Sequence, residues 1–224
     1  LKVYHASKQD TTRIKTLTFL IEAMSSNDWI KYQFYQYQEL QFLQEKSNND
    51  IKDALKVDFA SSLGNIGYAY YLKGKQDKAL EFYIRSQEIY EEIGDQSGIA
   101  SILNNMGLTY SELGNVKKAL LYYKRSLKIE EEIGDKQGIA LSLNNIGAIY
   151  NGQGQVKEAL VYYNNSLKIY QEIGEKEGVA RAFNNIGLIY SSQGKIKEAL
   201  DYLNRSLALR EEIGNRLSIA TTLN

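Results

Sequence analysis

Apolar residues recur along this chain at the spacing of a helical face, in paired segments. The first segment of one pair carries them four, three and four positions apart, at Ile139, Leu143, Ile146 and Tyr150. The second segment repeats the same spacing, at Val156, Leu160, Tyr163 and Leu167. This periodicity indicates two amphipathic helices. Gly154 lies between them, where the end of a helix favours a residue that can adopt positive φ.

The pair of segments belongs to a repeat of 40 residues. Residues 91–130 and 131–170 align without a gap and are identical at more than half of their positions, and 171–210 fits the same frame. A more diverged unit covers 61–90, and a fifth unit begins at Glu211 and stops at Asn224, the last residue of the sequence. Such a period predicts a stack of supersecondary units, because no single unit can bury its apolar face alone.

Local signals agree with two helices per unit. Short turns predict that consecutive helices pack antiparallel. N-cap candidates recur at the start of each unit, at Asp95, Asp135, Glu175 and Asn215. Small residues recur within both helices, at Gly107, Gly147, Gly187, Ala119, Ala159 and Ala199. Since mid-helix Gly costs about 1 kcal/mol relative to Ala, we interpret these positions as close helix–helix contacts.

The repeat resembles the tetratricopeptide repeat. The residues that match its pattern of an aliphatic–small pair, aromatics, Ala and a small residue are Leu143, Ile146, Gly147, Tyr150, Ala159, Tyr163 and Ser166. The resemblance implies an all-α fold, a right-handed α-solenoid of antiparallel helix pairs. The period is 40 rather than 34 and the usual Pro is missing, which implies longer helices. In this the array is similar to kinesin light chains, spindle-orientation adaptors and bacterial signalling arrays.

Two regions are expected. Residues 1–50 are interpreted as a diverged helical repeat or cap, although the alternating aromatics of Tyr32–Gln44 also suit a strand or an aggregation-prone stretch. Residues 51–224 form the array, with four repeats and the start of a fifth.

Composition argues against catalysis and against several classes of ligand. The chain has no Cys, one His (His5) and equal numbers of basic and acidic residues. No Ser–His or Cys–His arrangement can form, and the recurring Glu pairs are typical of solvated helix ends. We therefore expect no enzyme, no cofactor and no metal site. The balanced charge argues against nucleic-acid partners, and no apolar run is long enough for membrane insertion. Compartment stays open between cytoplasm, which is slightly favoured, and bacterial periplasm.

One polar feature does suggest function. Asparagines recur every 40 residues in one column, at Asn65, Asn105, Asn145 and Asn185, and a second column precedes it at Asn104, Asn144 and Asn184. Asn has only middling helix propensity, so its recurrence mid-helix calls for a reason. The resemblance implies that the first helices line a concave surface where such amides grip peptide ligands. The same face is expected to include Tyr68, Leu108, Leu188 and Arg181. Alternatively, the amides cross-link adjacent helices.

The sequence thus predicts a non-catalytic module that binds an extended or helical peptide segment of a protein partner in a largely neutral groove. The alternative is a sensory or regulatory region of a larger signalling protein with a kinase, cyclase or phosphatase domain. A weaker third hypothesis is self-association through an uncapped terminal helix.

Overall fold

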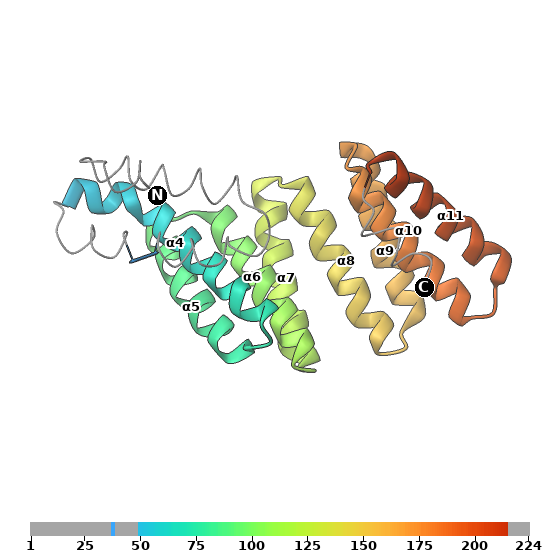
Figure 1. Ribbon diagram of the computed structural model, residues 1–224, viewed down its shortest axis with the longest axis horizontal. Coiled ribbons are helices and arrows are strands. Elements are labelled where there is room, and N and C mark those ends of the chain that lie inside the picture. Colours follow the sequence, from blue (N-terminus) through green and yellow to red (C-terminus); the bar gives the residue numbers. More distant parts are fainter. Residues whose placement is uncertain (1–36, 39–48, 215–224) are drawn as a thin grey trace. The chain divides into compact units, whose positions relative to one another are not determined.

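The computed structural model describes residues 37–38 and 49–214, and the described part is helical (Figure 1). Its helices are α4 (Asn49–Leu72), α5 (Gln76–Ile93), α6 (Gln96–Glu112), α7 (Val116–Ile133), α8 (Lys136–Gly152), α9 (Val156–Ile173), α10 (Lys176–Ser192) and α11 (Ile196–Glu212). They alternate as first and second helices of the 40-residue repeat. The structure therefore confirms the expected all-α fold of paired helices. From α5 onward each helix has 17 or 18 residues, and two helices of this length account for most of the 40-residue period.

Helix packing divides the chain into two compact units at Thr109–Tyr110. The first unit contains α4, α5 and most of α6. In the second unit α7 packs on α8, α8 on α9, α9 on α10 and α10 on α11. Residues 1–36, 39–48 and 215–224 lie outside the described residues, so the N-terminal cap and the fifth repeat, with Asn215 and its capping role, stay predictions.

The helix ends follow the predicted signals. Gly134 and Gly154 have φ of 72° and 73°, a left-handed conformation that only glycine adopts at little cost. Asp135 then caps α8, because its carboxylate accepts the Gly138 N–H at 3.1 Å. Asp95 does the same for the Gly98 N–H at 3.0 Å. These caps satisfy backbone donors that a helix start leaves unpaired.

Small residues allow the two helices of a repeat to pack closely. A Cβ on Gly147 would lie 2.9 Å from the ring of Tyr163, which is only 3% exposed, and Gly67 meets the ring of Tyr83 in the same way. Serines tie the pair together as well. Ser86 donates to the Ala60 carbonyl at 2.6 Å, Ser166 to that of Ala140 at 2.7 Å and Ser206 to that of Ala180 at 2.8 Å.

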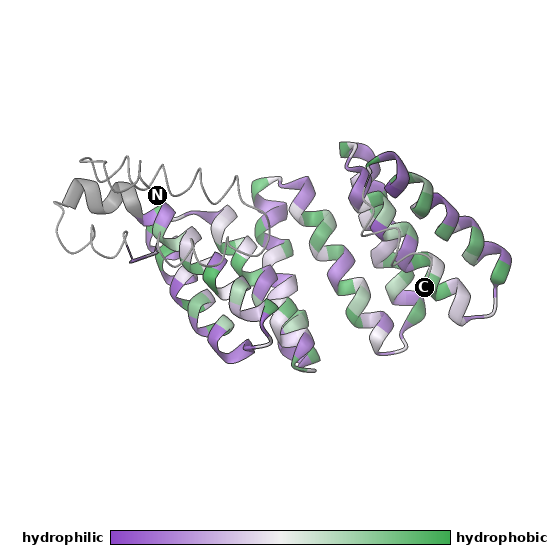
Figure 2. Cartoon of the chain, in the orientation of Figure 1, coloured by the Kyte–Doolittle hydropathy of each residue, from purple (hydrophilic) through white to green (hydrophobic). Residues whose placement is uncertain are grey.

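The core of each repeat lies between its helices. Hydrophobic and hydrophilic residues alternate along each helix, as expected for amphipathic helices (Figure 2). Ala79, Ala119, Ala159 and Ala199 are all buried in the core, as the small-residue pattern predicts. Among the described residues, no helix is long and apolar enough to cross a membrane. No group of His, Cys, Asp and Glu side chains suited to a metal ion occurs in that part of the chain either.

Candidate functional site

The candidate site is the solvent-facing side of the first helices α4, α6, α8 and α10, which we call the asparagine face. It is defined by Asn65, Asn105, Asn145 and Asn185, one on each helix. Asn65 is exposed, and the other three are half-buried. Each amide lies next to a buried aliphatic residue of the core, such as Ile146 after Asn145. The face is described separately for the two units.

In the first unit, the face carries an aromatic and an apolar contact surface. Tyr68 of α4 is 38% exposed and stacks on Tyr71, with ring centroids 5.9 Å apart. Leu108 of α6 is half-buried, while Asn104 is only 8% exposed. The first-column residue Asn65 and the second-column residue Asn104 thus differ in accessibility.

In the second unit, the two asparagine columns are joined. Asn144 of α8 is 4% exposed, and its Oδ1 accepts a hydrogen bond of 2.9 Å from Nδ2 of Asn185 on α10. This amide bridge connects the first helices of successive repeats. The expectation that amides cross-link adjacent helices therefore holds for this pair, and it does not exclude a ligand contact by the same Asn185.

The remaining members of the predicted site lie on α10. Leu188 is 53% exposed, and Asn184 and Arg181 are half-buried. Arg181 is close enough to Tyr170 to favour the ionised form of its phenol, although burial dominates and raises the pKa of Tyr170 to about 12. The second-unit face thus combines apolar surface, amides and one guanidinium.

Three structural features were missed by the sequence reasoning. One is the identity of the bridged pair: cross-linking amides were expected as an alternative, but Asn144 and Asn185 were not identified as the residues that meet. The second is a stacked aromatic pair in each repeat, in which a tyrosine at the end of a first helix lies on a ring of the second. The pairs, with centroid distances, are Tyr70–Phe82 at 5.4 Å, Tyr110–Tyr122 at 5.3 Å, Tyr150–Tyr162 at 5.2 Å and Tyr190–Tyr202 at 5.6 Å. The signal available was the recurrence of an aromatic twelve residues after each of these tyrosines.

The third feature is buried Glu130 at the end of α7, which is 3% exposed. Burial raises the pKa of its carboxyl, and hydrogen bonds from Ser142 and Ser126 offset part of that rise. The available signal was that Tyr90 and Tyr170 occupy the same repeat position.

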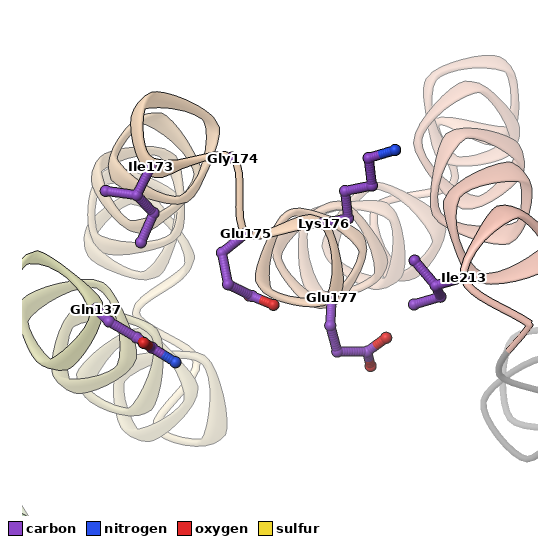
Figure 3. Close-up of a pocket in the computed structure, with 7 residues that line it drawn as sticks. All are labelled: Gln137, Ile173, Gly174, Glu175, Lys176, Glu177 and Ile213. Atoms are coloured by element: carbon purple, nitrogen blue, oxygen red, sulfur yellow. The ribbon is translucent and has the colours of Figure 1, made fainter.

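A shallow hollow lies away from the asparagine columns, where α9 passes into α10. Its lining includes Gln137 of α8, the Ile173–Glu177 turn and Ile213 after α11 (Figure 3). Lys176 beside it pairs with Glu212 on α11. Glu175 uses its carboxylate to cap α10 by accepting the Gly178 N–H. None of the predicted site residues lines this hollow.

The fold defines the class of protein: an α-helical repeat protein built from paired helices, with an asparagine at the same position of each first helix. The tetratricopeptide-repeat family model matches residues 58–132 and 138–212, so the chain belongs to the tetratricopeptide-repeat family. Repeats of this kind are typical of interaction and regulatory modules. No curated protein matches the sequence.

Solved structures share the fold at low identity. BtubC (BKLC) from P. vanneervenii is 23% identical with a TM-score of 0.73, over 95% of this chain and 85% of that one. A signal transduction ATPase with a tetratricopeptide repeat sensor from Pyrococcus horikoshii is 17% identical with a TM-score of 0.73, over 95% of this chain but 31% of that one. A Rap protein in complex with Competence and Sporulation Factor is 14% identical with a TM-score of 0.73, over 94% of this chain and 62% of that one.

Proposed function

We propose that this chain is a non-catalytic interaction module whose asparagine face binds an extended peptide segment of a protein partner. The observation that carries the proposal is the second-unit face, where Asn145 and Asn185 lie among apolar surface that includes exposed Leu188. Amides offer both donors and acceptors to a peptide backbone, whatever its side chains are. Apolar neighbours supply contact area for alternate side chains of an extended ligand.

The amide bridge favours this use of Asn185. Its bond to Asn144 engages one of two Nδ2 protons and leaves the Oδ1 oxygen available to accept a backbone N–H of a ligand. A side chain held in one orientation loses less conformational freedom when the ligand binds. The buried Asn144 would therefore orient Asn185 rather than touch the ligand.

Binding can be tested with linear peptides selected from a random phage-displayed library against the native chain. The affinity of one selected peptide is then measured for the double variant Asn145→Ala, Asn185→Ala. Each lost amide–backbone bond is worth about 1 kcal/mol, so we expect roughly a 30-fold loss for the pair. A peptide whose backbone nitrogens are methylated should lose affinity for the native chain and little for the variant.

The matched control is Asn165→Ala, Asn204→Ala, which makes the same chemical change at exposed positions of the second helices α9 and α11. It should leave the affinity unchanged, and circular dichroism should give equal helicity for all three proteins. Equal affinities of the two double variants would reject the asparagine face as the binding site. Failure of the native chain to select any peptide would reject peptide binding itself.

A second candidate is the sensory region of a larger signalling protein. It draws support from the structural likeness to an ATPase whose repeat region is described as a sensor, although this chain spans only 31% of that protein. The coding sequence on both sides of these 224 residues is the discriminating observation. A catalytic domain in the same reading frame would favour this candidate, and further repeats alone would count against it.

A further inference from the structure

The outer surface of α7 is basic, although the whole chain is neutral. Lys117, Lys124 and Lys128 are exposed at helical spacing on one side, and Leu121 among them is 55% exposed. No acidic residue occurs from 116 to 129. The surface formed by these four side chains, which we call the α7 strip, joins an apolar centre to a basic rim. Such an arrangement is typical of a small protein–protein contact.

The same repeat positions on α5 carry the opposite charge (α5 and α7 are labelled in Figure 1). Asp77, Glu81 and Glu88 are exposed, and Ile84 among them is 46% exposed. We call these four side chains the α5 strip. Two cations of α5 lie beside this strip, and both have other contacts. Lys78 is exposed, and its Nζ lies 5.4 Å from the centroid of the Tyr70 ring. Arg85 is half-buried and donates to Tyr37 Oη at 2.7 Å.

The two strips match when they run antiparallel. That register brings together Asp77 with Lys128, Glu81 with Lys124, Ile84 with Leu121, and Glu88 with Lys117. Every acid then meets a base, and the two apolar side chains meet each other. The parallel register places Glu81 on Leu121 and Ile84 on Lys124, which leaves both apolar residues against charges. The order of charged and apolar residues in the two strips therefore favours antiparallel over parallel pairing, in addition to making the strips opposite in charge.

We propose that the α7 strip is a docking surface for a second copy of this chain, which presents its α5 strip in antiparallel orientation. Each strip covers 12 residues, so the contact is about 18 Å long at 1.5 Å per residue. A contact of that length buries little area and belongs to the weak, transient class. Two reciprocal contacts would close a dimer, and single contacts would build an open chain.

The charges of both strips are available for this contact. Lys128 has one partner, Glu132, in an exposed i,i+4 pair at 3.7 Å, which is a weak competitor. A nucleic acid or an anionic membrane would use the bases, but neither would match the acidic α5 strip or its exposed Ile84. A second copy of this chain is complementary to both strips, because each copy carries one acidic strip and one basic strip.

The next best match to the α5 strip is α9, and it defines a competing arrangement. Its equivalent residues are Lys157, Val161, Asn164 and Lys168, so one ion pair is lost where Asn164 replaces Lys124. Arg125, which adds an exposed charge beside the α7 strip, is Asn165 on α9. The α7 strip is therefore the stronger partner.

The test is sedimentation of three proteins over a range of concentration at low and high salt. We expect the native chain to associate at low salt and to become monomeric near 1 M salt, where the Debye length is about 3 Å. One variant reverses the α5 strip (Asp77→Lys, Glu81→Lys, Glu88→Lys). The other reverses the α7 strip (Lys117→Glu, Lys124→Glu, Lys128→Glu). Each variant alone carries two strips of like charge and should stay monomeric.

An equimolar mixture of the two variants is the decisive sample, because it restores both complementary contacts between unlike copies. Association of the mixture, as a closed dimer or a longer assembly, supports the proposal. Two further variants compare equivalent exposed residues: Leu121→Ser should weaken association severalfold, and Val161→Ser should not. A native chain that is monomeric throughout overturns the proposal. Association that persists in both strip-reversal variants also overturns it. The same holds if association is lost in a Lys157→Glu, Lys168→Glu variant and kept in the α7 variant, because α9 would then be the partner. Peptide affinity at the asparagine face is a separate readout.

Discussion

Two helix junctions of the second unit occupy the same place in the repeat but differ in chemistry. Where α9 meets α10, Tyr170 is 3% exposed and its ring covers Gly178, so that a Cβ there would lie 2.4 Å from the ring. Burial raises the pKa of Tyr170 to about 12, further above physiological pH, where a tyrosine phenol is neutral in any case. This junction is a packed aromatic contact.

Where α7 meets α8, Glu130 takes the place of that tyrosine. It is equally buried and extends over Gly138, and its Oε1 accepts from Ser126 Oγ at 2.8 Å. Its Oε2 is buried and has no hydrogen-bond partner within the described part of the chain. An unsatisfied buried polar atom costs about 1–3 kcal/mol.

The difference teaches that the repeat requires a side chain over the glycine but not an aromatic one. The ring stabilises its junction by packing at any physiological pH. The pKa of the Glu130 carboxyl is raised, so the carboxyl stabilises its junction more when it is protonated than when it is ionised, and the stability of the α7–α8 junction is tied to pH. The following predictions test this contrast.

The largest effect is expected from removing the ring. Tyr170→Ala should destabilise the α9–α10 junction by about 3–5 kcal/mol, as for other large-to-Ala changes in cores. Hydrogen exchange of the α9 and α10 amides measures this locally, which matters because repeat arrays need not unfold in one step. The matched Glu130→Ala should cost clearly less at pH 8. Equal losses at the two junctions would contradict the contrast.

Next in size is the glycine beneath each side chain. In Gly178→Ala the new methyl group meets a rigid ring, and we expect a loss of about 2 kcal/mol despite the better helix propensity of Ala. In Gly138→Ala the nearest atoms include Glu130 Cγ at 2.8 Å, part of a flexible side chain that can move aside. That change should cost under about 1 kcal/mol. Thermal unfolding of both variants ranks them, and a larger loss at Gly138 would argue against the ring as the rigid element.

The pH dependence should come from Glu130. Burial is the largest cause of its raised pKa, and the nearby carboxylates Asp135 and Glu131 add to the rise. Because the folded pKa lies above the unfolded one, this group's contribution is complete below the unfolded pKa, and it is lost as pH rises through the folded pKa. Glu130→Gln removes the ionisation, so we expect it to be more stable than the native chain by about 1–2 kcal/mol at pH 8. Near pH 4 the two should be equal. A constant difference across that range would show that Glu130 does not ionise in the folded state.

Much of the fold could be predicted from the sequence because each signal is local and recurs. The apolar spacing located both helices of a repeat, and Gly154 and Asp135 marked their ends as the structure has them. The small residues located the close contacts between helices, since Gly147 has no room for a Cβ beside Tyr163. These features depend on a few neighbouring residues, so spacing alone reveals them.

The candidate site was less accessible to the same reasoning. Asn144 and Asn145 are adjacent, and the pattern gave no means to tell that the first is buried and bridges to Asn185. That contact joins residues 41 positions apart, and its geometry depends on how two repeats pack. Binding by the asparagine face stays a prediction. Glu130 was missed because three consecutive glutamates, Glu130 to Glu132, are typical of a solvent-exposed helix end.

The smallest expected effect concerns the caps that follow the two junctions. Asp135 caps α8 by accepting the Gly138 N–H, so Asp135→Ala should cost about 1 kcal/mol. Glu175 plays the same part for α10 but has a longer side chain, which loses more rotamer freedom when it is held. Glu175→Ala should therefore cost less, roughly a few tenths of a kcal/mol. Exchange of the Gly138 and Gly178 amides reports each cap directly: the first should speed up more than the second. If Gly178 responds more strongly, its protection depends on Glu175, and the covering Tyr170 ring is not enough to protect it.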